Sequence, residues 1–140
     1  MRSLVLTFLL AITTNAPLAG ELNDHEWKIV NYWSKSCAPC RVEIPEFNHL
    51  NQALTSFDVV VLGVDFDENE RETTLEIAEY MGIEFPTLTR AEVETLNLTP
   101  PAVLPTTYIL APDNTVKAKL IGAQDQQSVL AKLAELGIGK

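Results

Sequence analysis

The chain has 140 residues, of which 46% are hydrophobic, and a formal net charge of −9 from 19 acidic and 10 basic residues. A chain of this length can bury one hydrophobic core without cross-links, so its two cysteines are not needed as structural staples. The acidic balance and the scattered lysines and arginines argue against nucleic acid and favour proteins or small neutral molecules as partners.

The first 20 residues have the layout of an export signal. One basic residue, Arg2, precedes an apolar run over residues 4–12, and small and polar residues follow it. The alternative is an uncleaved anchor that tethers the chain to a membrane, but the run is shorter than the roughly 20 apolar residues that span a bilayer. Glu21 stands where a lipid-bearing cysteine would, so no lipid anchor is expected. We therefore expect a signal peptide or N-terminal anchor and then one exported domain, residues 21–140, in an oxidising periplasmic or other extracytoplasmic compartment.

Strand-like and helix-like patterns alternate after the signal. Short apolar, β-branched and aromatic runs at residues 27–33 and 58–66 predict two buried strands. Residues 38–55 between them predict a helix that Pro45 must kink or interrupt. The later elements are predicted at residues 70–81 (helix, ended by Gly82), 85–88 (extended), 90–98 (helix), 106–110 and 116–122 (antiparallel hairpin) and 126–136 (helix).

One βαβ unit followed by a hairpin and a helix predicts a single α/β domain. The helices are expected to bury one apolar side each. The residues predicted to face the core are Val42, Ile44, Phe47, Leu50, Leu54, Leu75, Ile77, Ala78, Met81, Val129, Leu130, Leu133 and Leu136.

The two cysteines, Cys37 and Cys40, lie between the first predicted strand and the first predicted helix. Unpaired N–H groups and the dipole at a helix start stabilise a negative charge, so a thiolate is favoured there. Because three residues make nearly one helical turn, the two thiols can face each other and close a disulfide. This placement favours reversible dithiol chemistry.

Other uses of the cysteine pair fit less well. A zinc site normally takes four ligands, and one CxxC with two isolated histidines, His25 and His49, lacks the paired spacing of such a site, so no metal site is expected. A structural disulfide would close a loop too small to stabilise much. A binding module that delivers Cu(I) through two thiolates remains an alternative from another functional class.

Four segments in order, "VNYWSKSCAPCRVEIPEF", "VVVLGVDFDEN", "GIEFPTL" and "LPTTYIL", resemble the thioredoxin superfamily. Within it, they are most similar to the exported TlpA- and ResA-like thiol–disulfide oxidoreductases. The resemblance covers about residues 27–136. It implies a thioredoxin-like fold, with a central mixed β-sheet flanked by helices. The usual N-terminal hairpin is reduced, because only "ELNDHE" separates the signal from the first strand.

The resemblance also implies roles for the site residues. Cys37 would be the exposed attacking thiol and Cys40 the buried resolving one, with their disulfide as the redox group and no other cofactor. Pro105 lies where the family has a cis-proline opposite the disulfide. The residues expected to contact or support a bound substrate segment are Trp33, Ala38, Pro39, Leu104 and Thr106.

An acidic residue that exchanges protons with the dithiol is expected at Glu68, by its match to the family pattern. A solvated acidic loop is the alternative, since Asp65 and Asp67 stand beside it. Asn31 occupies the position at which thioredoxin itself has a buried aspartate, which favours the exported subgroup.

The expected function is therefore an exported thiol–disulfide oxidoreductase, and the resemblance favours a reductant of protein disulfides over an oxidant. Its partners would be protein thiols or disulfides in the exported compartment and an unidentified electron donor. The alternative within the same chemistry is a reductase dedicated to cytochrome c maturation.

Overall fold

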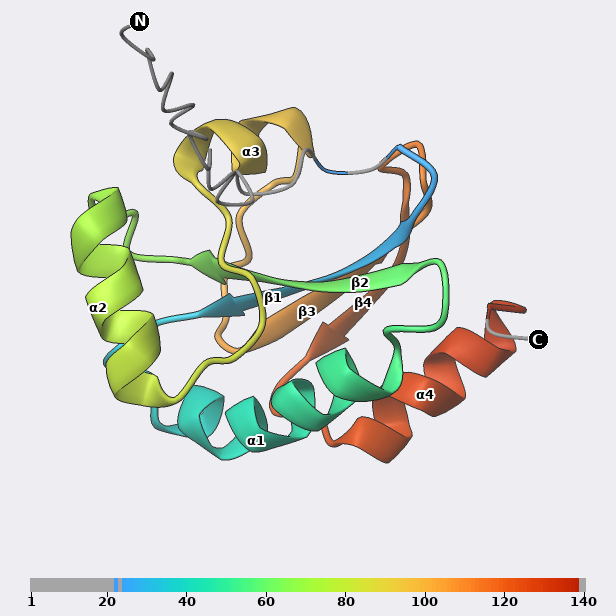
Figure 1. Cartoon of the computed structure of the whole chain (residues 1–140), viewed down its shortest axis with the longest axis horizontal. Coiled ribbons are helices and arrows are strands. Elements are labelled where there is room, and N and C mark those ends of the chain that lie inside the picture. The colour runs from blue at the N-terminus through green and yellow to red at the C-terminus, as the bar shows by residue number, and fades with distance from the viewer. Residues whose placement is uncertain (1–21, 23, 139–140) are drawn as a thin grey trace, which may run out of the picture.

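The computed structural model of the chain describes residue 22 and residues 24–138 (Figure 1). The predicted signal or anchor, residues 1–20, lies outside the described residues. The elements in chain order are β1 (Trp27–Trp33), α1 (Ala38–Ala53), β2 (Val59–Asp65), α2 (Arg71–Met81), α3 (Arg90–Thr95), β3 (Thr106–Leu110), β4 (Val116–Ile121) and α4 (Gln126–Glu135). Within the described residues no strand precedes β1, and no helix is long and apolar enough to cross a membrane.

The strands form one mixed sheet in the order β2-β1-β3-β4. β1 and β2 are parallel and joined through α1, whereas β3 is antiparallel to both β1 and β4. The predicted βαβ unit, hairpin and closing helix are therefore confirmed, as is the mixed sheet flanked by helices. In Figure 1, α1 and α4 lie along one side of the sheet, α3 lies on the other, and α2 stands beside the ends of the strands.

Successive residues of β1 point to opposite sides of the sheet, and this alternation builds two apolar layers. Ile29 packs in the layer that contains Phe47 of α1 and Val129 of α4. Val30 packs on the other side, in the layer that contains Leu96. The strand β1 is thus buried on both faces, as its continuous apolar sequence predicts.

Three side chains predicted to face the core are exposed instead. Val42 is 73% exposed, Leu75 46% and Leu130 37%, so the prediction for these residues is wrong. Each helical residue is rotated by about 100° around the helix axis from the one before it. Side chains two residues apart are therefore rotated by about 200° and point to nearly opposite sides of the helix. Val42 and the buried Ile44 therefore cannot face the core together, and the same holds for Leu75 and Ile77.

Pro45 does not interrupt α1, which runs unbroken from Ala38 to Ala53. Proline lacks the N–H that would bond to the carbonyl four residues earlier, that of Arg41. Both residues are exposed, so water can hydrogen-bond to this carbonyl.

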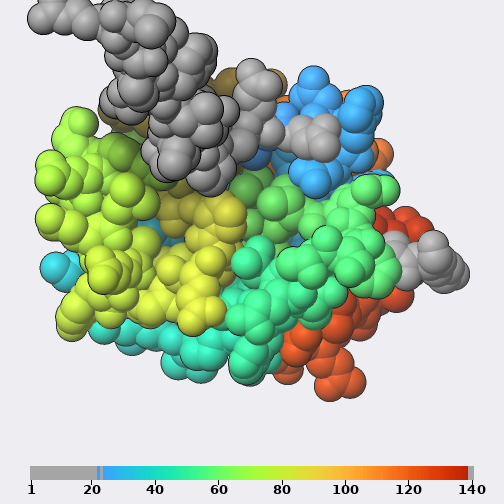
Figure 2. Space-filling model, in the orientation of Figure 1, coloured from blue at the N-terminus to red at the C-terminus, as the bar shows by residue number. Residues whose placement is uncertain are grey.

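The middle of β2 is covered along its outer edge by the segment between α2 and α3. The Gly63 N–H donates to the Pro86 carbonyl oxygen at 2.7 Å, and the Leu88 N–H donates to the Gly63 carbonyl oxygen at 2.9 Å. The extended piece predicted at residues 85–88 is thus confirmed, and it makes a parallel bridge from Thr87 to Gly63. Figure 1 shows this segment, drawn in yellow, in front of β2, and Figure 2 shows it at the surface beside α2.

Candidate active site

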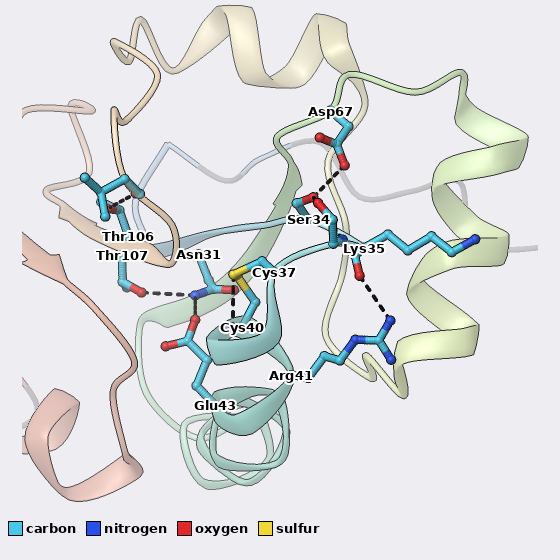
Figure 3. The surroundings of a disulfide bond; sticks show 12 residues. Asn31, Ser34, Lys35, Cys37, Cys40, Arg41, Glu43, Asp67, Thr106 and Thr107 are labelled. Carbon is cyan, nitrogen blue, oxygen red and sulfur yellow. Dashed lines mark hydrogen bonds between the residues drawn. A yellow bond between two sulfur atoms is a disulfide. The ribbon is translucent and has the colours of Figure 1, made fainter.

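The two cysteines form a disulfide at the N-terminus of α1, with their Cα atoms 5.3 Å apart (Figure 3). Cys37 is the N-cap of the helix, and its Sγ accepts a hydrogen bond from the Cys40 backbone N–H at 3.2 Å. Cys37 is half-buried, whereas Cys40 is fully buried. No acidic residue lies in the first turn of α1, so the dipole and N–H groups at this end act on the Cys37 sulfur without an opposing charge from that turn.

The loop before the disulfide is held by the loop after β2. Ser34 donates from Oγ to Asp67 Oδ2 at 2.6 Å, and its carbonyl oxygen accepts from the Cys37 N–H at 3.1 Å. Asp65 is 8% exposed and accepts hydrogen bonds from the Asp67 N–H, from Asn69 and from Thr74. The alternative of a solvated acidic loop is therefore wrong for Asp65, which ties β2 to the start of α2.

A buried carboxyl group that the sequence reasoning missed lies one turn into α1. Glu43 is 1% exposed and stands three residues after Cys40. Side chains three apart on a helix are neighbours, so Glu43 lies next to the buried cysteine. Burial raises the pKa of Glu43 to about 7, against the lowering effect of hydrogen bonds from Gln124 and Asn31. The signal in the sequence was a charged residue on the buried side of a helix, between Cys40 and Phe47.

Glu43 is joined to the sheet and to the loop before α4. Asn31 Nδ2 donates to Glu43 Oε1 at 2.6 Å and also to Thr107 Oγ1 at 3.1 Å. The Gln124 backbone N–H donates to the other carboxyl oxygen, Oε2, at 2.9 Å. Asn31 Oδ1 is buried without a hydrogen-bond partner. The surroundings of the disulfide in Figure 3 include this chain of three polar side chains, Glu43, Asn31 and Thr107.

Glu68, predicted to exchange protons with the dithiol, lies on the turn after β2 with a positive φ of 53°. Its carboxylate pairs with the Arg90 guanidinium, and its side chain is 61% exposed. Its charge acts on Tyr32, whose pKa is raised to about 12 by burial first, then by Tyr108 and Glu68. The catalytic role of Glu68 stays a prediction, and Glu43 is the carboxyl group beside Cys40.

The Leu104–Pro105 bond is cis, as the resemblance implies. Leu104 packs against the apolar cluster that contains Trp33 and Cys40. Ala38 and Pro39, between the cysteines, are exposed and available to a partner.

Two predicted substrate-binding residues are buried. Trp33 and Thr106 are both 0% exposed, so their side chains can support a binding surface but do not reach a partner in this structure. Thr106 Oγ1 donates to the Val103 carbonyl oxygen at 2.7 Å and so holds the loop before Pro105.

Within the described part of the chain, no group of three or more histidine, cysteine, aspartate or glutamate side chains is placed to hold a metal ion. His49 is exposed on α1, three turns from the disulfide.

Comparison with known proteins gives consistent results. The model of the AhpC/TSA family matches residues 18–119. The chain is 26% identical over 118 residues to the thiol-disulfide oxidoreductase ResA of Bacillus cereus, covering 83% of this chain and 68% of that protein.

Solved structures share the fold. StoA from Bacillus subtilis superposes with a TM-score of 0.62 at 20% identity, over 75% of this chain and 80% of that chain. A secreted thiol-disulfide isomerase from Corynebacterium glutamicum superposes with a TM-score of 0.62 at 23% identity, over 76% and 68% of the two chains. The predicted thioredoxin-like fold is therefore confirmed.

Proposed function

The chain belongs to the AhpC/TSA family and is a thiol–disulfide oxidoreductase, and we propose that it is exported and reduces disulfide bonds in partner proteins. The observation that carries the proposal is the asymmetry of the dithiol. Cys37 is accessible and accepts a hydrogen bond at a helix N-terminus, whereas Cys40 is buried behind it. An enzyme that exchanges disulfides with protein substrates uses this arrangement, with one sulfur that a partner can reach and one that it cannot. The arrangement suits both directions of exchange, and the choice of reduction rests on the family resemblance.

The reaction would run in two exchanges. The Cys37 thiolate attacks one sulfur of the partner disulfide, forms a mixed disulfide and releases the other partner sulfur as a thiolate. The Cys40 thiolate then attacks Cys37 Sγ, so that the partner leaves as a dithiol and the Cys37–Cys40 disulfide closes. The two electrons come from the protein dithiol, and an electron donor in the exported compartment would restore it.

Glu43 supports the second exchange. Cys40 must lose a proton before it attacks, and its burial leaves water little access to it. With a pKa of about 7, Glu43 is ionised in part of the molecules near neutral pH and can accept this proton. Asn31 and the Gln124 N–H hold the carboxyl group in place for the transfer.

The partner segment would bind beside the cis-proline. The backbone of Leu104 is proposed to pair with an extended substrate segment, with Pro105 next to the disulfide and Thr106 bracing the loop. Ala38 and Pro39 form the exposed surface between the cysteines, and Trp33 packs behind it.

Export is supported by the signal-like pattern of residues 1–20. A structural relative is described as secreted, in agreement with this pattern. The mass of the protein purified from its native host distinguishes a cleaved signal from a retained anchor.

Trapping tests the reaction. Cys40→Ser keeps the attacking sulfur and removes the resolving one, so it should accumulate mixed disulfides that non-reducing gels and mass spectrometry detect. Cys37→Ser, the matched control, should trap none. Equal trapping by both variants would contradict the proposed roles, and trapping by Cys37→Ser alone would reverse them. Trapped partners that are all apocytochromes c would favour the dedicated reductase.

A further inference from the structure

Two exposed basic side chains lie beside the disulfide of a protein that is acidic overall. The chain carries a net charge of −9, yet Lys35, shortly before Cys37 in the sequence, and Arg41, directly after Cys40, are both exposed. Arg41 also donates from its guanidinium to the Lys35 carbonyl oxygen at 3.0 Å, which links the helix to the loop before the disulfide.

An aromatic ring, rather than a carboxylate, holds these two cations. The Lys35 ammonium lies 5.7 Å and the Arg41 guanidinium 5.3 Å from the centre of the Tyr80 ring, which α2 presents 67% exposed. The described residues form two ion pairs, Arg90 with Glu68 and Lys132 with Glu135, and neither involves Lys35 or Arg41. Their charges are therefore available to a partner.

These three residues, Lys35, Arg41 and Tyr80, form what we term the basic patch, and it lies on a defined side of the disulfide. In Figure 3, Lys35 and Arg41 extend toward α2, whereas Thr106 and Thr107 lie on the other side of the cysteines. Asp67, which accepts a hydrogen bond from Ser34, keeps its negative charge, but in Figure 3 its carboxylate lies away from the ends of the Lys35 and Arg41 side chains. A segment that docks at the loop before Thr106 and crosses the disulfide thus continues over the basic patch.

From this arrangement we propose that the basic patch binds acidic side chains of the partner that lie next to the partner's disulfide cysteine. The inference rests on the proposed function and adds a substrate preference to it. Carboxylates would pair with Lys35 and Arg41, and the Tyr80 ring holds both cations ready, so less side-chain freedom is lost on binding. The N-terminus of α1 adds a positive potential of the same sign.

The experiment compares short peptides of equal length, each with one cysteine in a disulfide with neutral 2-thiopyridine. Aspartates, asparagines or lysines flank the cysteine, on its N-terminal or its C-terminal side. Release of 2-thiopyridone by the reduced protein gives the second-order rate constant. The neutral peptide controls for any change in the reactivity of Cys37 itself.

An exposed ion pair changes a binding equilibrium by a factor of about two to five. At low ionic strength we therefore expect the second-order rate constant of the acidic peptide to be about five-fold higher than that of the neutral one. The preference should fall toward one in high salt and in the Lys35→Gln/Arg41→Gln double variant. The Lys117→Gln/Lys119→Gln double variant, which removes the same charge from β4, should keep it. Tyr80→Phe should also keep it, because the ring remains.

Equal rates for the acidic and neutral peptides would overturn the inference while leaving the proposed function intact. A preference that survives in the Lys35→Gln/Arg41→Gln variant would also overturn it. If no peptide disulfide is reduced, the proposed function fails, and the inference fails with it.

Discussion

Replacing Glu43 by glutamine should change how the stability of the oxidised protein depends on pH. A carboxyl group whose pKa is raised by folding stabilises the native state below its unfolded pKa, and this contribution is lost as the pH rises through the folded pKa. For Glu43 the two values are 4.5 and about 7. At about 1.36 kcal/mol for each pH unit between them, the loss is at most about 3 kcal/mol.

Glutamine keeps the shape but cannot ionise. Its amide group can still be satisfied, because Asn31 can turn its own amide and present Oδ1, which is otherwise unpartnered, while Thr107 donates in place of accepting. The free energy of unfolding of Glu43→Gln relative to the parent should therefore rise between pH 4.5 and pH 8, by up to about 3 kcal/mol.

Denaturant unfolding of both proteins at several pH values measures this difference. Glu79→Gln, which removes an exposed carboxyl from α2, controls for the loss of one negative charge. A stability difference that is constant from pH 4.5 to pH 8 would show that Glu43 is not a raised, buried acid, and would remove it from the proposed proton transfer.

In the peptide assay, Glu43→Gln should slow release of the reduced peptide near neutral pH by about ten-fold or more while leaving formation of the mixed disulfide unchanged; equal slowing of both steps would point to a structural effect. Gly63→Ala should lower the free energy of unfolding by about 1–3 kcal/mol, because an added Cβ would lie 2.9 Å from Trp33 Nε1 and 3.0 Å from the Phe85 ring. An unchanged denaturation midpoint would mean that these rings can move aside without a loss of stability. Glu68→Gln should lower the thiol pKa, measured by alkylation rate against pH, if Glu68 acts on the dithiol as the resemblance implies. A curve identical to that of the parent would mean that Glu68 has no effect on the dithiol and that its only role is the ion pair with Arg90.

The sequence predicted the elements that depend on local patterns. Both parallel strands, the hairpin and the placement of Cys37 and Cys40 at a helix start follow from apolar runs, turn residues and spacing, and the structure has them. Which side of each helix is buried was less predictable, because Val42 and Leu75 are apolar but point away from the sheet. Apolar character alone does not give the direction of a side chain.

Glu43 escaped prediction for a related reason. A glutamate in a helix is normally expected to face solvent. The burial of Glu43 depends on hydrogen bonds from Asn31 and from the Gln124 N–H, which are distant from it in the sequence. The spacing of Cys40, Glu43 and Phe47 does place Glu43 on the buried side of the helix, but nothing in the local sequence shows which distant groups would bond to its carboxyl group. Conversely, Glu68 matches the family pattern in sequence, while the fold turns its side chain toward Arg90 and solvent.

The hydrogen bond from the Gln124 N–H to Glu43 gives the protein a natural spectroscopic reporter. Gln124 lies 81 residues from Glu43 in the sequence and directly before α4, and its amide proton points at a carboxyl oxygen beside the dithiol. The resonance frequency of an amide proton depends on the charge of its acceptor. The ¹⁵N-labelled protein should therefore display the titration of the active-site acid at the Gln124 amide, in the oxidised and reduced states alike, without a mutation or an added dye.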